Sequence, residues 1–589
     1  MPVIATAGHV DHGKSTLVRA LTGMEPDRWA EERRRGMTID LGFAWTTLPT
    51  GPTVAFVDVP GHERFVPNML AGVGPVPAVL FVVAADEGWM PQSQEHLEAL
   101  HALNVQHGLL AVTRSDLMDP EPAREEALEH LAGSSLGPIP AVCVCAVTGA
   151  GLEDLRAALG SLVAGLPAPD LDADVRLWVD RAFTIHGAGT VVTGTLTGGT
   201  LHVGDELEVG PGGRRVRVRG LQSLGLPVKS VPPVARVAVN LRGVSREAVC
   251  RGAALLTPRA WLATCTLDVR LSPGPATGLP RHVLLHVGTT AVAARVRPLG
   301  ADTARLSLAQ PLPLRIGDRA LLRDPGARRI PAGITVLDVA PPVLRRRGAA
   351  AARATELSTM EDIPDGAAEL RRRGVVRRDT LIAMGAPEPP GAPQAGGWLV
   401  DPTVLAQRAA RLTDAITAHT TAHPLEPGMP LETARQITEM PDTRLVELLL
   451  APPLTLTNGR VHLTGAATRI PNTVRDAIAE IRAELAQRPF AAPEAHRLAE
   501  LGLGPQQLAA AVRTGQLLKI ADGIYLAPGA DKVAIKRLHD LPSPFTLSQA
   551  RQALNTTRRV ALPLMKLLAH RGITHQLPNG THEFRSAQV

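Results

Sequence analysis

The segment from Gly8 to Ser15 constrains the fold more than any other part of this 589-residue sequence. It fits the pattern G-x-x-x-x-G-K-[ST] of a phosphate-binding loop, with an apolar strand predicted over 3–6 and a helix over 15–21. The glycines allow a tight turn that points backbone N–H groups at phosphates, while the lysine reaches the terminal phosphates and the serine faces Mg²⁺. The residues expected at the phosphates are Gly8, His9, Val10, Asp11, His12, Gly13, Lys14, Ser15 and Thr16.

Two later segments predict the parts of the site that sense the γ-phosphate. Thr38 lies after a charged, Arg-rich stretch that is typical of a loop, so GTP can order this threonine beside the metal and GDP can release it. Asp58 ends the apolar run 54–57, where its carboxylate can hold Mg²⁺ through water, and the N–H of Gly61 can sense the γ-phosphate. The predicted magnesium residues are therefore Ser15, Thr38 and Asp58.

The base-reading residues follow two further predicted strands. The apolar run 109–112 leads into Thr113, Arg114 and Asp116, and an acid there can accept both N–H donors on the edge of guanine. Adenine offers no such pair of donors, so the expected nucleotides are GTP and GDP. The last strand ends at Cys145 and Ala146, which supply a backbone N–H for the guanine carbonyl.

Together these motifs resemble those of the translational GTPases, and their exact residues resemble those of the bacterial selenocysteine-specific elongation factors in particular. The similar segments are D-H-G-K at 11–14, R-G-M-T-I-D-L-G at 35–42, D-V-P-G-H-E-R-F at 58–65, N-M-L-A-G at 68–72 and A-A-D-E-G-W-M-P-Q at 84–92. Two positions depart from the family pattern, because Arg114 stands where Lys is usual and Cys145 where Ser is usual. An arginine stem can still stack on a purine, and Cys145 would act through its backbone, so we expect altered nucleotide affinity at most.

The resemblance covers the whole chain and implies its function. It implies a GTPase, stimulated by the ribosome, that delivers selenocysteinyl-tRNA at recoded UGA codons and binds an mRNA hairpin through its C-terminal domain. A general aminoacyl-tRNA carrier or initiator-tRNA GTPase is the alternative, but it would not need about 240 residues beyond the first 340. A DNA-binding regulator, which winged helices alone would suggest, would not need a complete GTPase.

The composition is typical of a multi-domain protein of the cytoplasm. The length predicts about four domains, or more if some are small. No run of eighteen apolar residues occurs, so we expect no membrane span, and the predicted strand at the very start argues against a signal peptide. Four cysteines without a C-x-x-C pair argue against zinc and against a disulfide scaffold. A net charge of +6 and a pI near 9.5 favour a nucleic-acid partner, and we expect a monomer.

Changes of sequence pattern predict the domain organisation. Strands alternate with helices over 1–170, as in an α/β GTP-binding domain, and alternating strands with frequent turns then predict β-barrels over 171–258 and 259–341. The tail repeats helices followed by a hairpin turn, at Gly396-Gly397, Asn458-Gly459, Asp522-Gly523 and Asn579-Gly580. This repeat predicts four winged helices over 350–410, 411–470, 471–528 and 529–589; one irregular helical domain is the alternative.

His62 is the catalytic candidate, because it follows the glycine expected to sense the γ-phosphate. A histidine there can orient the attacking water or stabilise charge near it, and phosphoryl transfer depends mainly on positioning and electrostatics. The resemblance implies that the ribosome draws this residue into the site. We assign no proton chemistry to His9 and His12.

The resemblance also implies a selenocysteine pocket on the first barrel, formed by Asp180, Arg181 and Arg236. A selenol can be anionic near neutral pH, whereas serine is neutral, so cationic side chains can discriminate between them. A further histidine of the family has no clear match, since Val192 stands nearby. The alternative is that Asp180 and Arg181 form a surface ion pair of little consequence.

Basic residues in the last predicted winged helix are the RNA-binding candidates. They are Lys536, Arg537, Arg558, Arg559 and Arg571, accompanied by Lys532 and Lys566. Because aromatic residues are few, phosphate contacts to a structured hairpin are expected rather than base stacking. A solvated charged face is the alternative.

Overall fold

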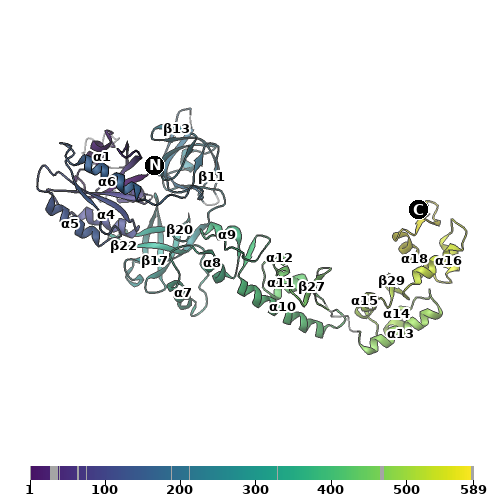
Figure 1. Ribbon diagram of the computed structural model, residues 1–589. Coiled ribbons are helices and arrows are strands. Elements are labelled where there is room, and N and C mark those ends of the chain that lie inside the picture. Colours follow the sequence, from purple (N-terminus) through teal and green to yellow (C-terminus); the bar gives the residue numbers. More distant parts are fainter. Residues whose placement is uncertain are drawn as a thin grey trace. The chain divides into compact units, whose positions relative to one another are not determined.

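The computed structural model describes residues 2–585 with the exception of 27–37, 39, 63–65, 75, 188, 211–212, 328, 427 and 465–469. The Arg-rich stretch 31–35, which we expected to be a loop, lies outside the described residues. Contacts divide the chain into two compact parts (Figure 1). The first part comprises residues 1–372 and 376–390, and the second comprises 373–375 and 391–589.

The first part begins with an α/β domain built on a six-stranded sheet of order β2-β3-β1-β4-β5-β6. Only β2 is antiparallel to its neighbour. The strands are β1 (Val3–Ala7), β2 (Gly42–Thr47), β3 (Thr53–Asp58), β4 (Ala78–Ala84), β5 (His107–Thr113) and β6 (Ala141–Cys143). All seven residues of β4 are buried, as expected for a central parallel strand covered on both faces.

Helices cover both faces of this sheet and leave its carboxyl edge to loops. They are α1 (Lys14–Thr22), α3 (Val66–Val73), α4 (Pro91–Ala102), α5 (Glu121–Ala132) and α6 (Leu152–Ala164). One apolar layer packs α3, α4 and α5 on the sheet, and a second packs α1 and α6 on the opposite face. In such open sheets, ligands bind at the carboxyl ends of the strands, which is where the predicted nucleotide motifs lie.

The first barrel follows, and its strands alternate between buried and more exposed residues as the sequence predicts. Strand β15, for example, alternates along its whole length. A pairing of β11 with β12 closes the ring β11-β16-β7-β9-β15-β12, and β8 and β13 extend the sheet. These strands are β7 (Arg176–Trp178), β8 (Arg181–Ile185), β9 (Gly189–Leu196), β11 (Glu206–Val209), β12 (Arg215–Ser223), β13 (Leu226–Val228), β15 (Ala235–Arg242) and β16 (Ala254–Leu256), while β10 (Leu201–His202) and β14 (Ser230–Val231) pair separately.

The second barrel is a closed ring of order β17-β20-β19-β18-β21-β22. Its strands are β17 (Ala263–Ser272), β18 (His282–Val287), β19 (Thr290–Pro298), β20 (Thr303–Pro313), β21 (Arg319–Asp324) and β22 (Arg329–Asp338). Closure pairs every strand on both sides, so the barrel presents no sheet edge. Both predicted barrels are thus confirmed.

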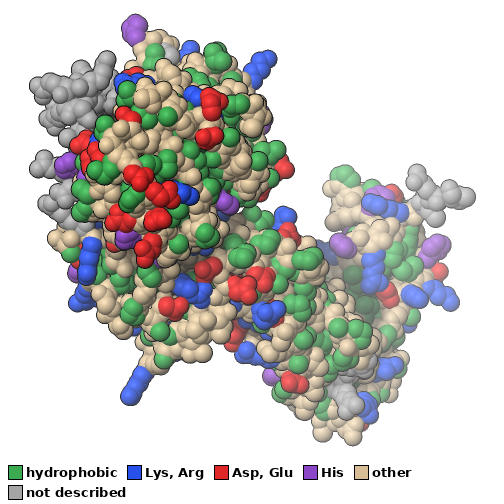
Figure 2. Space-filling model, turned by 60° about the vertical axis from the view of Figure 1, so that its left-hand side comes forward, with side chains coloured by type: hydrophobic (Ala, Val, Ile, Leu, Met, Phe, Trp, Pro, Cys, Tyr) green, Lys and Arg blue, Asp and Glu red, His purple; other side chains and the backbone are tan. Residues whose placement is uncertain are grey.

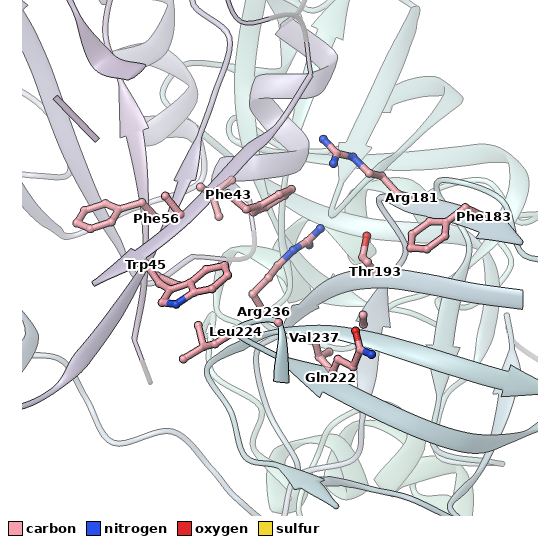
Figure 3. Close-up of a pocket in the computed structure, with 15 residues that line it drawn as sticks. Phe43, Trp45, Phe56, Arg181, Phe183, Thr193, Gln222, Leu224, Arg236 and Val237 are labelled. Carbon is pink, nitrogen blue, oxygen red and sulfur yellow. The ribbon is translucent and has the colours of Figure 1, made fainter. Parts of the chain in front are cut away.

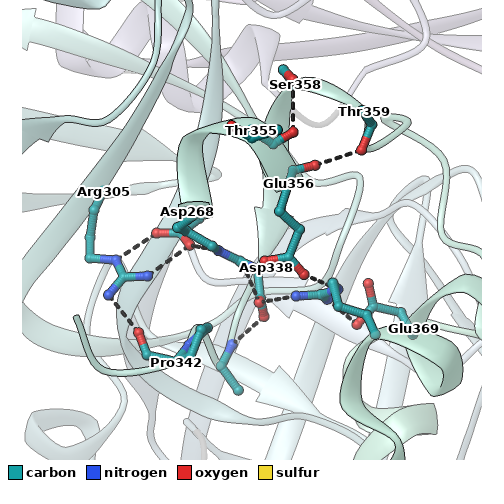
Figure 4. A network of polar contacts seen from close by, with 12 residues as sticks. Asp268, Arg305, Asp338, Pro342, Thr355, Glu356, Ser358, Thr359 and Glu369 are labelled. Atoms are coloured by element: carbon teal, nitrogen blue, oxygen red, sulfur yellow. Dashed lines mark hydrogen bonds and ion pairs between the residues drawn. The ribbon is translucent and has the colours of Figure 1, made fainter. Parts of the chain in front are cut away.

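A buried charged network fixes the next helices to the second barrel (Figure 4). Asp268 on β17 and Asp338 on β22 are both 0% exposed. Arg353 of α7 (Ala349–Ser358) donates to Asp268 at 2.7 Å and to Asp338 at 2.6 Å, and Arg305 binds Asp268 at 2.7 and 2.9 Å. Removing one partner of such a pair leaves a buried charge without compensation, which typically lowers the free energy of unfolding by about 3–5 kcal/mol.

This network fixes part of the segment 350–410, which the sequence predicts to be one winged helix, to the second barrel. Arg372 of α8 (Gly366–Arg373) also donates to Asp338, at 2.6 Å. Contacts accordingly assign α7, most of α8 and α9 (Arg378–Ala383) to the first compact part. Residues 391–410 belong to the second part, so the predicted segment is divided between the two.

The second part contains all four predicted hairpins. They are formed by β24 (Gln394–Ala395) with β25 (Trp398–Val400), β27 (Leu454–Thr457) with β28 (Arg460–Leu463), β29 (Leu518–Ala521) with β30 (Ile524–Leu526), and β31 (Thr574–Gln576) with β32 (His582–Phe584). The first three close with the two-residue turns that the sequence predicts, in which Gly397, Gly459 and Gly523 have positive φ angles. The fourth turn is a longer loop that includes Asn579 and Gly580.

Short helices accompany these hairpins, in keeping with winged-helix units. They are α10 (Pro402–Ala422), α11 (Leu431–Ile437), α12 (Thr443–Glu447), α13 (Asn472–Gln487), α14 (Ala495–Glu500), α15 (Pro505–Arg513), α16 (Ala530–His539), α17 (Leu547–Ala553) and α18 (Arg558–His570). One apolar core lies within residues 375–463 and another within 470–584. Helix α10 continues through residues 410 and 411, so the domain boundary expected there falls inside a helix. No helix among the described residues is both long and apolar enough to cross a membrane.

Candidate functional site

The predicted phosphate-binding loop joins β1 to α1 at the carboxyl edge of the sheet. Gly8 has a φ of 128°, and a Cβ atom there would collide with the carbonyl oxygen of Val82, so only glycine fits. Lys14 is buried and donates from Nζ to the carbonyl oxygens of Gly8 at 2.9 Å and His9 at 2.6 Å. Burial lowers the pKa of Lys14 to about 8. The first N–H groups of α1 and this amine form an anion site suited to phosphates.

Helix α4 supports the loop through two side chains. His96 Nδ1 accepts from the Gly8 N–H at 3.1 Å, and Gln92 Oε1 accepts from the Val10 N–H at 3.0 Å. Burial lowers the pKa of His96 to about 3 and that of His12 to about 4, so both rings are neutral at physiological pH. A neutral imidazole nitrogen can accept a hydrogen bond, which is the role that His96 has here. Sequence reasoning missed His96, because no local motif links it to a loop 88 residues away.

The three predicted magnesium residues come together beside this loop. Ser15 Oγ donates to Asp58 Oδ2 at 2.6 Å and lies 2.9 Å from Thr38 Oγ1. Thr6 was not predicted, and it donates to the other Asp58 oxygen at 2.8 Å, which orients the buried carboxylate. Two hydroxyl groups and a carboxylate are the hard oxygen donors that Mg²⁺ prefers, so the residues present fit this ion.

Gly61 lies directly against the phosphate-binding loop. A Cβ atom at this position would come within 2.6 Å of the Val10 nitrogen and 2.7 Å of Lys14 Nζ. The close approach therefore requires glycine and places the Gly61 backbone beside the lysine expected at the γ-phosphate. His62 follows it and is half-buried, and residues 63–65 lie outside the described part of the chain.

The predicted guanine loops are tied to the phosphate-binding loop. Thr113 Oγ1 donates to the His12 carbonyl at 2.7 Å. Arg114 forms ion pairs with Asp86 at 2.9 Å and Glu87 at 2.8 Å, and also donates to the carbonyl of Asp11. This departure from the family pattern therefore has a structural role, since one side chain connects three loops.

In the other predicted guanine loop, the backbone of Cys145 already has a hydrogen-bond partner. The Cys145 N–H donates to the Ala150 carbonyl at 2.9 Å, so it is committed within its own loop. Asp116 is exposed, and its loop is joined to the 145 loop by a bond from the Ser115 N–H to the Val144 carbonyl at 3.4 Å.

Two of the three predicted aminoacyl residues, Arg181 and Arg236, line a cavity of about 270 Å³ between the α/β domain and the first barrel (Figure 3), and the third, Asp180, pairs with Arg236. Arg236 NH2 donates to Asp180 Oδ1 at 2.7 Å, and its guanidinium lies 3.8 Å from the centroid of the Phe43 ring. Thr193 also donates to Asp180 Oδ1, at 2.7 Å. Arg181 instead donates from Nε to Asp40 Oδ2 at 3.0 Å.

These contacts argue against a surface pair between Asp180 and Arg181. Asp180 is only 6% exposed and pairs with Arg236, while Arg181 pairs with a residue of the α/β domain. A buried pair of this kind is strongly oriented by its surroundings. Among the described residues that line the cavity there is no histidine, and Val192 is fully buried in the barrel core.

The structure separates the predicted RNA-binding residues into two groups. Arg559 pairs with Glu494 at 2.8 Å, Arg571 pairs with Asp531, and the Arg537 guanidinium lies 5.4 Å from the Phe490 ring centroid. By contrast, an exposed face of α18 presents side chains at four-residue spacing, namely Arg558, Leu562, Lys566 and His570. Lys532 and Lys536 are exposed on α16.

Family models match three segments of the chain. They are the Elongation factor Tu GTP binding domain over residues 1–164, the Selenocysteine-specific elongation factor beta-barrel domain over 276–343, and the Elongation factor SelB winged helix over 536–582. A crystal structure of a bacterial selenocysteine-specific elongation factor is 24% identical in sequence, covers 100% of both chains and has a TM-score of 0.77. This likeness supports the arrangement of an α/β domain, two barrels and winged helices.

Two curated relatives carry the name of the same family. The selenocysteine-specific elongation factor of Desulfomicrobium baculatum is 42% identical over 345 residues, so the match spans about half of each protein, 55% of this chain and 54% of the relative. That of Escherichia coli K12 is 35% identical over 472 residues, covering 76% of this chain and 75% of the relative. A match of that identity and extent shows that the chain belongs to the family of selenocysteine-specific elongation factors.

Proposed function

We propose that this chain binds GTP with Mg²⁺, hydrolyses GTP on the ribosome, and delivers selenocysteinyl-tRNA at UGA codons that an mRNA hairpin marks for recoding. The observation that carries the proposal is that Arg181 and Arg236 line one cavity beside the nucleotide-binding domain, where Asp180 is bound to Arg236. A pull-down tests it, by asking which tRNA co-purifies with the GTP form. Retention of selenocysteinyl-tRNA is expected, whereas retention of initiator or mixed elongator tRNAs would support the alternative carrier.

Nucleotide binding follows from the residues at the carboxyl edge of the sheet. The α1 N–H groups and Lys14 bind the phosphates, and Ser15, Thr38 and Asp58 would hold Mg²⁺, which when bound neutralises charge on the phosphate oxygens. Asp116 accepts from the guanine edge. Because the Cys145 N–H is committed to Ala150, we assign the guanine carbonyl to the N–H of Ala146. His62 orients the attacking water from its position after Gly61.

Selenocysteine is recognised, in this proposal, by charge at the cavity. Arg181 and Arg236 both line it, and the two cations together face a small space bounded by Phe43 and Phe183. A selenolate gains a charge-assisted hydrogen bond there, whereas a neutral serine hydroxyl does not. Asp180 and Asp40 hold the two guanidinium groups in place.

Replacing both arginines with glutamine should therefore weaken binding of selenocysteinyl-tRNA but hardly affect seryl-tRNA. Glutamine removes the charge but retains an amide donor toward Asp180, so the buried carboxylate is not left without a partner. The expected loss for the selenocysteinyl form corresponds to about 1.5–3 kcal/mol. Protection of each aminoacyl-tRNA from deacylation, in GTP, measures both affinities.

The pH dependence of wild-type binding provides a control for this prediction. Below the pKa of the selenol the substrate is neutral, so wild type should lose its discrimination and come to resemble the variant. Equal losses for the seryl and selenocysteinyl forms would mean that these arginines bind the tRNA backbone and do not read the side chain.

RNA binding is proposed for the last winged helix, on the strength of its charge. Residues 529–589 carry nine Lys and Arg against three Asp and Glu, an excess equal to the +6 net charge of the whole chain. Figure 2 shows Lys and Arg side chains over this end of the chain. We assign the RNA contacts to the exposed face of α18, with Lys532 and Lys536 of α16 beside them in the sequence, because Arg559 and Arg571 are paired with acidic neighbours.

Reversing Arg558 and Lys566 to glutamate in the full chain should weaken binding of the mRNA hairpin and reduce its salt dependence. Each lost phosphate contact lowers the slope of log affinity against log salt by roughly 0.7–0.9. Gel-shift titrations at several salt concentrations measure this slope. Reversal of Arg482 and Arg488, both exposed near the end of α13, makes the same change of net charge and should have little effect. Equal losses for the two double variants would move the RNA site away from α18.

A further inference from the structure

The segment from Thr38 to Phe43 connects the nucleotide site to the aminoacyl cavity. At one end, Thr38 Oγ1 lies 2.9 Å from Ser15 Oγ, in the predicted magnesium site. At the other end, the Phe43 ring lies beneath both arginines of the cavity, 5.3 Å from the Arg181 guanidinium and 3.8 Å from that of Arg236. One wall of the cavity is therefore formed by β2, which begins four residues after Thr38.

Asp40 lies in the middle of this segment and forms a hydrogen-bonded ion pair with Arg181. The Arg181 Nε and NH2 atoms are 3.0 and 2.9 Å from Asp40 Oδ2, and NH2 also donates to the carbonyl of Leu41. About a fifth of each side chain is exposed, 22% for Arg181 and 23% for Asp40, so the pair is shielded from solvent on most sides. The hydrogen bond to Asp40 and the donation to the Leu41 carbonyl together fix the direction of the guanidinium as well as its position.

We propose that Asp40 is a positioning residue through which the nucleotide state controls Arg181, and hence the affinity of the aminoacyl pocket. Asp40 follows Thr38 by two residues, a span of at most about 7 Å along the chain. When Thr38 is held at Ser15, Asp40 is placed to orient the Arg181 guanidinium. When hydrolysis releases Thr38, Asp40 loses that position and Arg181 loses its orienting partner. This inference rests on the proposed roles of Thr38 and Arg181.

Thermodynamic linkage makes the coupling measurable without any tRNA. If the Asp40–Arg181 pair forms only when Thr38 is at the magnesium site, the pair stabilises the GTP form and not the GDP form. Breaking the pair from either side must then weaken binding of GTP relative to GDP. If the pair joined the two domains equally in both nucleotide states, breaking it would leave the ratio of GTP to GDP affinity unchanged.

The test compares Asp40→Asn, Arg181→Gln and the double variant of the full chain, by titrating a non-hydrolysable GTP analogue and GDP. Each single variant should lose roughly tenfold in the ratio of GTP-analogue to GDP affinity, the scale of one charge-assisted hydrogen bond. The double variant should lose no more than either single variant, because one pair is broken in all three. Arg215→Gln is the matched control, since it removes an exposed ion pair to Glu206, at 2.9 Å, within the first barrel and should leave the ratio unchanged.

The outcomes separate this inference from the proposed function. Unchanged ratios, or losses that add in the double variant, would overturn the coupling whatever the tRNA measurements show. A shared loss in the ratio, with no loss of discrimination between selenocysteinyl- and seryl-tRNA in Arg181→Gln, would retain the coupling and reject the selenocysteine-reading role. Asp40→Asn should also reduce selenocysteinyl-tRNA binding in GTP but not in GDP, and an equal reduction in both states would contradict the inference.

Discussion

Replacing His62 with alanine is expected to slow ribosome-stimulated GTP hydrolysis at least about 100-fold, the usual scale for a positioned catalytic group. Binding of GTP should stay nearly unchanged, because the proposed phosphate contacts come from Lys14 and the α1 N–H groups and not from His62. The reason for the large effect is position: Gly61 lies so close to Val10 and Lys14 that a Cβ atom would collide with them, and His62 follows Gly61 beside the place proposed for the γ-phosphate.

Single-turnover hydrolysis on programmed ribosomes, with selenocysteinyl-tRNA bound, measures the effect. His202→Ala is the matched control. His202 is exposed on the first barrel, so this variant should hydrolyse GTP at the wild-type rate. Equal rates for His62→Ala and wild type would exclude His62 from catalysis. A fall in GTP affinity that matches the fall in rate would make His62 a binding residue.

The clustering of the predicted magnesium residues could be predicted because each of their motifs is local. Ser15, Thr38 and Asp58 lie after a strand or beside one, and parallel strands bring their carboxyl ends to the same edge, where the structure joins the three residues. The hairpin turns were predictable for a similar reason. A two-residue turn needs positive φ angles that glycine and asparagine tolerate, and the structure has such turns at three of the four predicted places.

Contacts between distant segments could not be predicted in this way. His96 supports Gly8 across 88 residues, and Arg353 binds Asp268 across 85, yet neither residue type nor periodicity distinguishes these side chains from solvated ones. For the same reason, the sequence could not show that the predicted segment 350–410 is divided between the two compact parts. The buried charges that fix α7 to the barrel come from strands far earlier in the chain. The sequence also could not show that Arg559 and Arg571 are occupied by acidic partners.

The second large effect is expected at Asp116, the residue proposed to read guanine. Asp116→Asn should lower the ratio of GTP to XTP affinity by roughly 10²–10⁴, since two charge-assisted hydrogen bonds are each worth about 1.5–3 kcal/mol. The carboxylate offers two acceptors to the N1–H and the amino group of guanine. The asparagine amide offers one acceptor and one donor, which match the N1–H and the C2 carbonyl of xanthine.

The neighbouring loops make this substitution a clean test of base reading. Asp116 is exposed, and its backbone turn is held by the bond from the Leu117 N–H to the Arg114 carbonyl at 3.0 Å, so the fold does not depend on the carboxylate. Asp119→Asn makes the same chemical change at an exposed position three residues along the chain and should leave GTP preferred. Competition binding of GTP and XTP to wild type and both variants measures the ratio. If Asp116→Asn retains the wild-type preference for GTP, another group must read the guanine edge, because no amide can accept both of its donors.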